Sequence, residues 1–240
     1  MHAYSQLPSP CILAHQGLWQ TSTPNTLEAF SRAIEFGADV IETDAHSSKE
    51  GIAILFHDDM FNGKNINKFS MDELPDFVPT LDAALTSFPE TLFNIDIKSS
   101  DAEDAVARTV AKRNAQKRVL ITSFSARRRK RTIELVPGVA QSPALAEMLR
   151  TVLWSSLGAR KRAIKILKQF DAVQIPANAY GINLVSPKMM KIYREAQVLV
   201  HVWTINDPQE MKKLFSIGID GIVTDRTDLA QEVRRTYFDK

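Results

Sequence analysis

Two carboxylates end an apolar stretch early in the chain. Val40-Ile41 leads into Glu42-Thr43-Asp44, a pattern typical of a buried strand that reaches the protein surface. Side chains alternate between the two faces of a strand, so Glu42 and Asp44 share one face and Thr43 takes the other. Two neighbouring acids repel each other unless a cation, a proton or a basic side chain lies between them. The pair therefore predicts a charged site.

A second pair with the same spacing stands at the end of the stretch Leu92–Ile97. Its members are Asp96 and Lys98. Together with Glu42 and Asp44, Asp96 forms an all-oxygen set, which selects a hard divalent cation, Mg²⁺ or Ca²⁺. Lys98 is then a point charge for a phosphate oxygen, with a plain ion pair to Asp96 as the alternative. One pair of acids is a weak signal by itself, and the second pair is what favours a metal site.

Two histidines also stand at strand ends. His15 and His57 are the predicted proton carriers, because imidazole titrates near neutral pH. One of them can deprotonate a nucleophile while the other protonates the leaving oxygen. His46 and His201 are predicted to be structural: His46 shares the face of Glu42 but lies past the predicted strand end, and His201 lies within a strand.

The elements that position these residues alternate along the whole chain. Predicted strands are Cys11–His15, Val40–Asp44, Ile52–Phe56, Leu92–Ile97, Val119–Thr122, 139–144, Ala172–Ile175, Val198–Trp203 and Gly221–Thr224. Predicted helices are 26–36, 80–88, 101–113, 126–135, 148–170 with a break near Gly158, 187–196, 207–217 and 228–238. Eight strand–helix units predict an α/β fold: a (β/α)8 TIM barrel, one domain over residues 1–240, with a short insertion after the second strand. A doubly wound open sheet is the alternative. In such a barrel the carboxyl ends of the strands meet at one rim.

Bulk properties restrict the partners. The net charge of +2 gives no reason to expect nucleic acid. Cys11 is the only cysteine, which excludes disulfides and thiolate metal sites and predicts a small buried hydrophobe. The first ten residues lack a signal-peptide pattern, so a cytoplasmic location is expected. The basic run 127–131 is predicted to be a solvated outer helix, with a contact to anionic lipid or nucleic acid as the alternative. The run 160–168 is predicted to be an outer barrel helix that packs its apolar stripe inward, with a contact to membrane surfaces as the alternative.

The order and spacing of several motifs resemble the glycerophosphodiester phosphodiesterase family. The motifs are His15-Gln16-Gly17, 24–30, Glu42-Thr43-Asp44, 49–51, His57-Asp58-Asp59, 94–98, 123–125, 202–206 and 221–225. The resemblance implies a barrel enzyme that hydrolyses glycerophosphodiesters to glycerol 3-phosphate and an alcohol. It further implies that His15 and His57 act as acid and base, that Glu42, Asp44 and Asp96 hold the cation, and that Lys98 lies near the phosphate. The substrate is then a small phosphodiester.

Two positions depart from the family pattern. Gln16 stands where the family has Arg, and Pro24 stands where it has Glu. Gln keeps hydrogen-bond donors but loses the charge and the bidentate fork, so phosphate binding is expected to weaken. Substrate contacts are predicted for Gln16 and Lys98 and for two aromatic residues at strand ends, Phe124 and Trp203, for which barrel filling is the alternative. A catalytically impaired barrel serving as a ligand-binding or interaction module is the other functional hypothesis, and a lysophospholipase D-like activity is a third.

Overall fold

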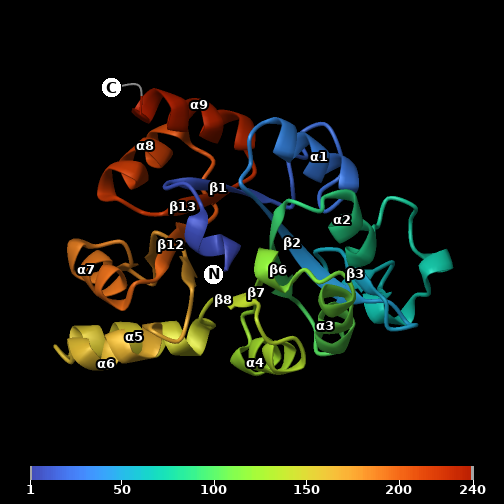
Figure 1. The fold of residues 1–240 in the computed structure, drawn as a ribbon, viewed down its shortest axis with the longest axis horizontal. Coiled ribbons are helices and arrows are strands. Elements are labelled where there is room, and N and C mark those ends of the chain that lie inside the picture. Colours follow the sequence, from blue (N-terminus) through green and yellow to red (C-terminus); the bar gives the residue numbers. More distant parts are fainter. Residues whose placement is uncertain (1, 239–240) are drawn as a thin grey trace.

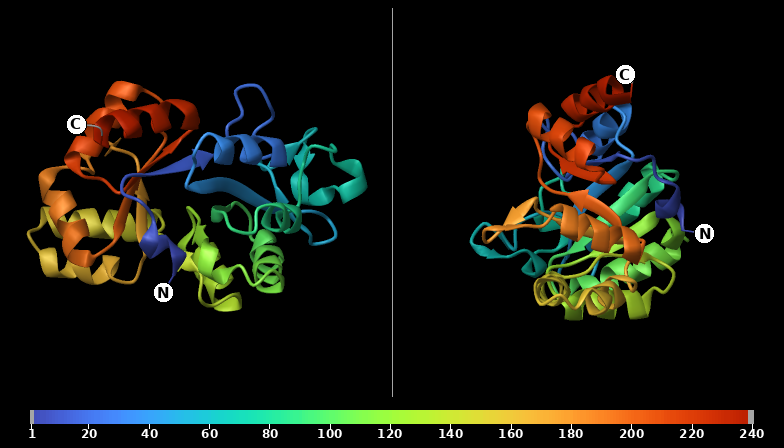
Figure 2. Two further views of the ribbon diagram at one scale, coloured as in Figure 1. Left: turned by 45° about the horizontal axis from the view of Figure 1, so that its top comes forward. Right: turned by 90° about the vertical axis from the view of Figure 1, so that its left-hand side faces the viewer.

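Eight parallel strands form a nearly closed barrel in the computed structural model, which describes residues 2–238 (Figure 1). The strands are β1 (Cys11–His15), β2 (Val40–Ser47), β6 (Leu92–Ile97), β7 (Val119–Thr122), β8 (Ala140–Gln141), β9 (Ala172–Ile175), β12 (Leu199–Val202) and β13 (Gly221–Thr224). Their spatial order is β8-β7-β6-β2-β1-β13-β12-β9. Helices surround this barrel in all views (Figure 2). The predicted single-domain TIM barrel is confirmed.

The register of the strands fixes the rim. His15 pairs with Glu42, and Glu42 pairs with Asn94 on its other side. Two residues further on, Asp44 lies directly opposite Asp96. Because parallel strands end at the same edge, this register brings the first histidine and all three acids to neighbouring positions.

Hydrogen bonds also join the two strands at the ends of this order, β8 and β9. The Asp171 N–H donates to the Gln141 carbonyl at 3.0 Å, and the Gln141 N–H donates to Asp171 Oδ2 at 2.8 Å. The strand predicted over 139–144 is wrong in length, since β8 has only two residues. Pro143 lies two residues beyond it, and proline lacks the N–H that a longer ladder needs.

Nine helices cover the strands within the described residues. They are α1 (Leu27–Glu35), α2 (Leu81–Ser87), α3 (Ala102–Lys112), α4 (Ala126–Leu135), α5 (Leu145–Ser156), α6 (Arg160–Leu167), α7 (Pro187–Ala196), α8 (Pro208–Ile217) and α9 (Thr227–Phe238). The break predicted near Gly158 separates α5 from α6, and Gly158 has a φ of +74°, which favours glycine. In the described residues no helix has both the length and the apolar character needed to cross a membrane.

The basic run 127–131 on α4 is only partly a solvated face. Arg129 is buried, donates to Glu147 Oε1 at 2.7 Å and lies over the Phe170 ring. Arg128 donates to the Lys98 carbonyl. The prediction of a wholly solvated helix face is therefore wrong for these two arginines, which tie α4 to its neighbours.

The segment after β2 contains the predicted insertion. Strand β3 (Ala53–Leu55) pairs antiparallel with β2, and this pairing extends β2 to Ser47. His46 consequently lies inside the strand, and the prediction that it lies past the strand end is wrong. A hairpin of β4 (Met60–Phe61) and β5 (Lys64–Asn65) follows, with the 3-10 helices η2 (Ile66–Lys68) and η3 (Met71–Glu73).

Apolar side chains fill the barrel from its amino-terminal end. Tyr4 of the 3-10 helix η1 (Ala3–Gln6) is buried there with Cys11, Leu13 and Val40. The 3-10 helix η4 (Gln116–Arg118) contacts η1, and His2, which precedes η1, has its Nε2 2.9 Å from the Gln116 carbonyl. Packing at this end leaves the opposite rim free for polar side chains.

Candidate active site

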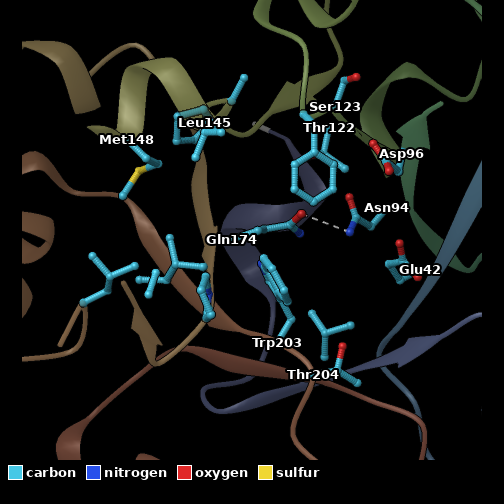
Figure 3. Close-up of a pocket in the computed structure, with 18 of the residues that line it drawn as sticks. Glu42, Asn94, Asp96, Thr122, Ser123, Leu145, Met148, Gln174, Trp203 and Thr204 are labelled. Atoms are coloured by element: carbon cyan, nitrogen blue, oxygen red, sulfur yellow. Dashed lines mark hydrogen bonds between the residues drawn. The ribbon is translucent and has the colours of Figure 1, made fainter. Parts of the chain in front are cut away.

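A cavity of about 480 Å³ opens at the carboxyl ends of the strands (Figure 3). Eight of the nine predicted site residues line it: His15, Glu42, Asp44, His57, Asp96, Lys98, Phe124 and Trp203. The ninth, Gln16, is buried behind the lining. The convergence predicted from the strand ends is thus present.

Two of the three acids, Asp44 and Asp96, share one ammonium group. Lys98 Nζ lies 3.1 Å from Asp44 Oδ1 and 3.5 Å from Asp96 Oδ2. Burial, and then the charge of Asp44, raises the pKa of Glu42 to about 8. Burial likewise raises the pKa of Asp96 to about 6, although the charge of Lys98 opposes it. The cluster is therefore short of positive charge.

Amide side chains hold Asp44 from behind. Gln16 Nε2 donates to Asp44 Oδ2 at 2.7 Å, and Asn25 Nδ2 donates to the same oxygen at 3.0 Å. Asn25 Oδ1 accepts from Thr43 Oγ1 at 2.6 Å. Gln16 and Asn25 have φ values of 59° and 58°, in the left-handed region. These contacts fix the orientation of Asp44, and they turn the Gln16 amide towards the acids.

His15 is held by a carboxylate that directly follows the last barrel strand, β13. Its Nδ1 lies 2.7 Å from Asp225 Oδ1, and its Nε2 lies 3.9 Å from Glu42 Oε2. Burial lowers the pKa of His15, but the hydrogen bond to Asp225 and the charge of Glu42 outweigh burial and raise the pKa to about 9. Asn206 Nδ2 donates to Asp225 Oδ2 at 2.7 Å. Both oxygens of Asp225 are therefore engaged, and His15 Nε2 is the nitrogen left for a substrate.

His57 lies on the exposed side of the cavity. Its side chain is 55% exposed, and its Nδ1 lies 2.8 Å from Asp58 Oδ1. The other two histidines considered in the sequence do not line the cavity. His46 is buried, with Nε2 3.7 Å from Asp59 Oδ1, and His201 is buried with Nε2 3.8 Å from Cys11 Sγ.

The three acids carry the oxygen ligands that a hard cation needs. Among residues 2–238, no three His, Cys, Asp or Glu side chains stand close enough together to hold an ion as they lie, and the Lys98 ammonium lies within 3.5 Å of two of the acids. Asp96 Oδ1 is nevertheless buried without a hydrogen-bond partner in the described part of the chain. This unpartnered carboxylate oxygen belongs to the same cluster as Glu42, whose pKa is raised. A hard divalent cation fits such a group of oxygens.

The far wall of the cavity is apolar. Figure 3 shows Leu145 and Met148 of α5 opposite Glu42 and Asp96, with Trp203 and Gln174 between the two walls. Phe124 is 66% exposed and meets Trp203 edge to face, with ring centroids 6.4 Å apart. Phe124 and Trp203 both line the cavity. Their positions agree with the predicted substrate contacts better than with the alternative, in which they only fill the barrel.

Sequence reasoning missed two groups of site residues. Asn25 and Asp225 belong to the quoted motifs, but nothing in their spacing revealed that they orient Asp44 and His15. The second group is the hairpin of β10 (Asn178–Ala179) and β11 (Ile182–Asn183), whose exposed Tyr180 lines the cavity. Its Tyr-Gly turn was the available signal.

Comparisons with known proteins agree with this geometry. The sequence model of the glycerophosphoryl diester phosphodiesterase family matches residues 15–229. A probable glycerophosphodiester phosphodiesterase 2 from Mycobacterium tuberculosis is 32% identical over 236 residues, covering 92% of this chain and 89% of that protein. A glycerophosphodiester phosphodiesterase structure from Thermotoga maritima has a TM-score of 0.75 at 26% identity, covering 93% of this chain and 97% of that one.

A further solved structure supports the fold. It is a phosphodiesterase from Oleispira antarctica in complex with sn-glycerol-3-phosphate, with a TM-score of 0.79 at 21% identity, covering 98% of this chain and 100% of that one. The family match extends over nearly the whole barrel and includes every strand-end residue described above. The chain therefore belongs to the glycerophosphoryl diester phosphodiesterase family, a family of phosphoric diester hydrolases.

Proposed function

We propose that this chain hydrolyses glycerophosphodiesters to glycerol 3-phosphate and an alcohol, with the help of a divalent cation and two histidines. The observation that carries the proposal is the convergence of His15, His57 and the acid cluster on one cavity, in a chain of this family. The acids of that cluster are Glu42, Asp44 and Asp96.

Those three acids are the residues that would hold Mg²⁺ or Ca²⁺. When bound, such an ion supplies Lewis-acid stabilisation of charge on phosphate oxygens. The unpartnered Asp96 Oδ1 supports this assignment. Lys98, whose ammonium already lies at the acids, provides a second positive charge for the phosphate.

The two histidines are assigned the proton transfers. Asp225 fixes the His15 ring through Nδ1, so Nε2 serves the reacting oxygen. His57 reaches the same cavity from the end of β3. Gln16 is assigned a positioning role rather than a direct phosphate contact, because its Nε2 donates to Asp44.

Turnover of glycerophosphocholine and glycerophosphoethanolamine with added Mg²⁺ or Ca²⁺ tests the proposal. The wild type should release glycerol 3-phosphate, and His57→Ala and Asp96→Asn should lose most of that activity. Asp228→Asn is a matched control, because Asp228 pairs with Arg226 and does not line the cavity. Absence of metal-dependent turnover on any phosphodiester would leave the ligand-binding or interaction module as the better account.

A lysophospholipase D-like activity is the second candidate. The apolar wall around Leu145 and Met148 favours it, because a diester with an acyl chain would place hydrocarbon there. Comparing turnover of lysophosphatidylcholine and glycerophosphocholine separates the two. A preference for the lysolipid that Met148→Gln reverses supports the acyl-chain substrate, and equal loss on both substrates contradicts it.

A further inference from the structure

Exposed apolar side chains gather at the mouth of the cavity. Five residues that line it are large, apolar and exposed: Phe124, Leu145, Leu149, Tyr180 and Ile182. They come from the β7 end, from helix α5 and from the β10–β11 hairpin. Single exposed apolar residues are normal on protein surfaces, whereas a group around one opening indicates a contact surface.

Helix α5 extends this group into a stripe. Leu145, Leu149 and Leu153 recur every four residues and are 51%, 54% and 52% exposed, and Leu157, which follows the helix, is 65% exposed. Residues four apart lie on one side of a helix. Leu145 and Leu149 also line the cavity, so the apolar surface is continuous from the cavity wall to the outside. We call these four leucines the α5 stripe.

Basic residues predominate in the segment that contains the α5 stripe. Between Met148 and Phe170 the sequence has six Lys or Arg and no Asp or Glu. The acid of α5 is turned inward, since Glu147 pairs with buried Arg129. Arg150 Nε donates to the Ala146 carbonyl at 3.2 Å, which keeps its side chain along the exposed face of α5. On α6, Arg160 alone has an acidic partner in the described residues, Glu195.

We propose that the α5 stripe docks on the surface of an anionic phospholipid bilayer. Leucine side chains can enter the boundary between headgroups and acyl chains, while the cations of α5 and α6 attract anionic headgroups. A protein partner with an acidic rim would satisfy the charge, but a lipid surface also suits a stripe that leads into an apolar cavity wall. The proposal concerns binding and does not depend on hydrolysis.

Vesicle flotation with the full chain tests the proposal. Vesicles of phosphatidylcholine mixed with phosphatidylglycerol should bind the wild type more tightly than vesicles of phosphatidylcholine alone. The double variant Leu153→Glu/Leu157→Glu should lose about tenfold or more in binding, because both residues are exposed and neither lines the cavity. Arg150→Gln should lose about fivefold, the contribution expected of one basic residue near an anionic surface.

Phe36→Glu is the matched control. Phe36 is 44% exposed at the end of α1, across the molecule from α5 in Figure 1. This variant should bind vesicles like the wild type, and both Glu variants should melt near the wild-type temperature. The double variant should also hydrolyse soluble glycerophosphocholine at the wild-type rate, which keeps this test separate from that of the proposed function.

Three results would overturn the proposal. The first is no binding of the wild type to anionic vesicles, and the second is equal binding of the double variant. The third is a wild-type dimer on size exclusion that the double variant dissociates, without vesicle binding, which would identify the stripe as a contact between two copies of the chain.

Discussion

Replacing Asp225 by Asn tests how His15 is held. The carboxylate accepts from His15 Nδ1 through one oxygen and from Asn206 Nδ2 through the other, each at 2.7 Å. Although burial raises the pKa of Asp225, the hydrogen bonds from His15 and Asn206 lower it on balance. An amide in that place has only one acceptor, so it cannot serve both donors.

Asn206 cannot resolve this conflict by turning over. Its Oδ1 accepts from Thr224 Oγ1 at 3.0 Å and from the Asp225 N–H at 2.9 Å, which fixes its amide nitrogen towards position 225. The introduced NH₂ group must therefore face His15 Nδ1. That nitrogen then has to accept, so the ring loses its Nδ1 proton and its positive charge and keeps only the proton on Nε2, the nitrogen assigned to the substrate.

The expected cost follows from the charged hydrogen bond that is lost. Such a bond contributes about 1.5–3 kcal/mol, which corresponds to about 10- to 150-fold in kcat/KM for glycerophosphocholine. Nitrogen NMR of the imidazole near neutral pH should show His15 without its Nδ1 proton in Asp225→Asn and with it in the control Asp228→Asn. Wild-type kcat/KM in a folded Asp225→Asn protein would refute the reasoning, and so would lost activity in a variant that keeps the Nδ1 proton.

The remaining predictions concern stability and ion binding. Burial lowers the pKa of His201 to about 4 from its ordinary 6.5. As the pH falls, the unfolded chain therefore binds a proton at His201 before the folded chain does. The free energy of unfolding should fall by up to about 3 kcal/mol as the pH is lowered from 6.5 to 4. Urea unfolding of His201→Gln should show a smaller fall over the same pH range. An equal fall in the wild type and the variant would contradict this. Gly221→Ala should cost about 1–3 kcal/mol, because its Cβ would lie 2.5 Å from Cys11 Sγ. Adding Cys11→Ala should restore part of the lost melting temperature. No recovery in the double variant would contradict the assignment to Cys11 Sγ. Saturating Mg²⁺ or Ca²⁺ should raise the melting temperature by about 5–10 °C in the wild type but not in Asp96→Asn, and equal shifts would place the ion elsewhere.

Most of the fold could be predicted from the sequence because its elements carry strong local signals. The boundaries of β6, β7, β9, α4, α7 and β13 agree with the predicted ranges. The predicted ends of elements were wrong where a contact outside the element sets its length. β2 runs to Ser47 only because β3 pairs with it, and no periodicity within β2 could show that. α5 begins at Leu145 because Glu147 Oε2 accepts from the Ala144 N–H at 2.8 Å, a cap with no Ser or Thr to announce it.

The candidate site divides in the same way. Strand parity and strand ends predicted which side chains share the rim, and eight of nine line the cavity. They could not predict which polar groups lie behind the rim. Asn25 contacts Asp44, which is 19 positions away in the sequence, and Asp225 contacts His15, which is 210 positions away. The residue that does not line the cavity, Gln16, has a left-handed backbone conformation that directs its amide to Asp44. A neutral side chain at a strand end carries no sequence signal for such a turn.

The presence of Gln16 changes the charge balance of the cavity. Its amide gives Asp44 a hydrogen bond at 2.7 Å, whereas the Arg of the family pattern would bring a full positive charge. The acids are left with Lys98 and His15 as their cationic neighbours, and burial, followed by the charge of Asp44, still raises the pKa of Glu42. A divalent cation would add positive charge at the place where the unpartnered Asp96 Oδ1 lies. The loss of the Arg should therefore strengthen cation binding while it weakens phosphate binding, and turnover depends on which of these two effects is larger.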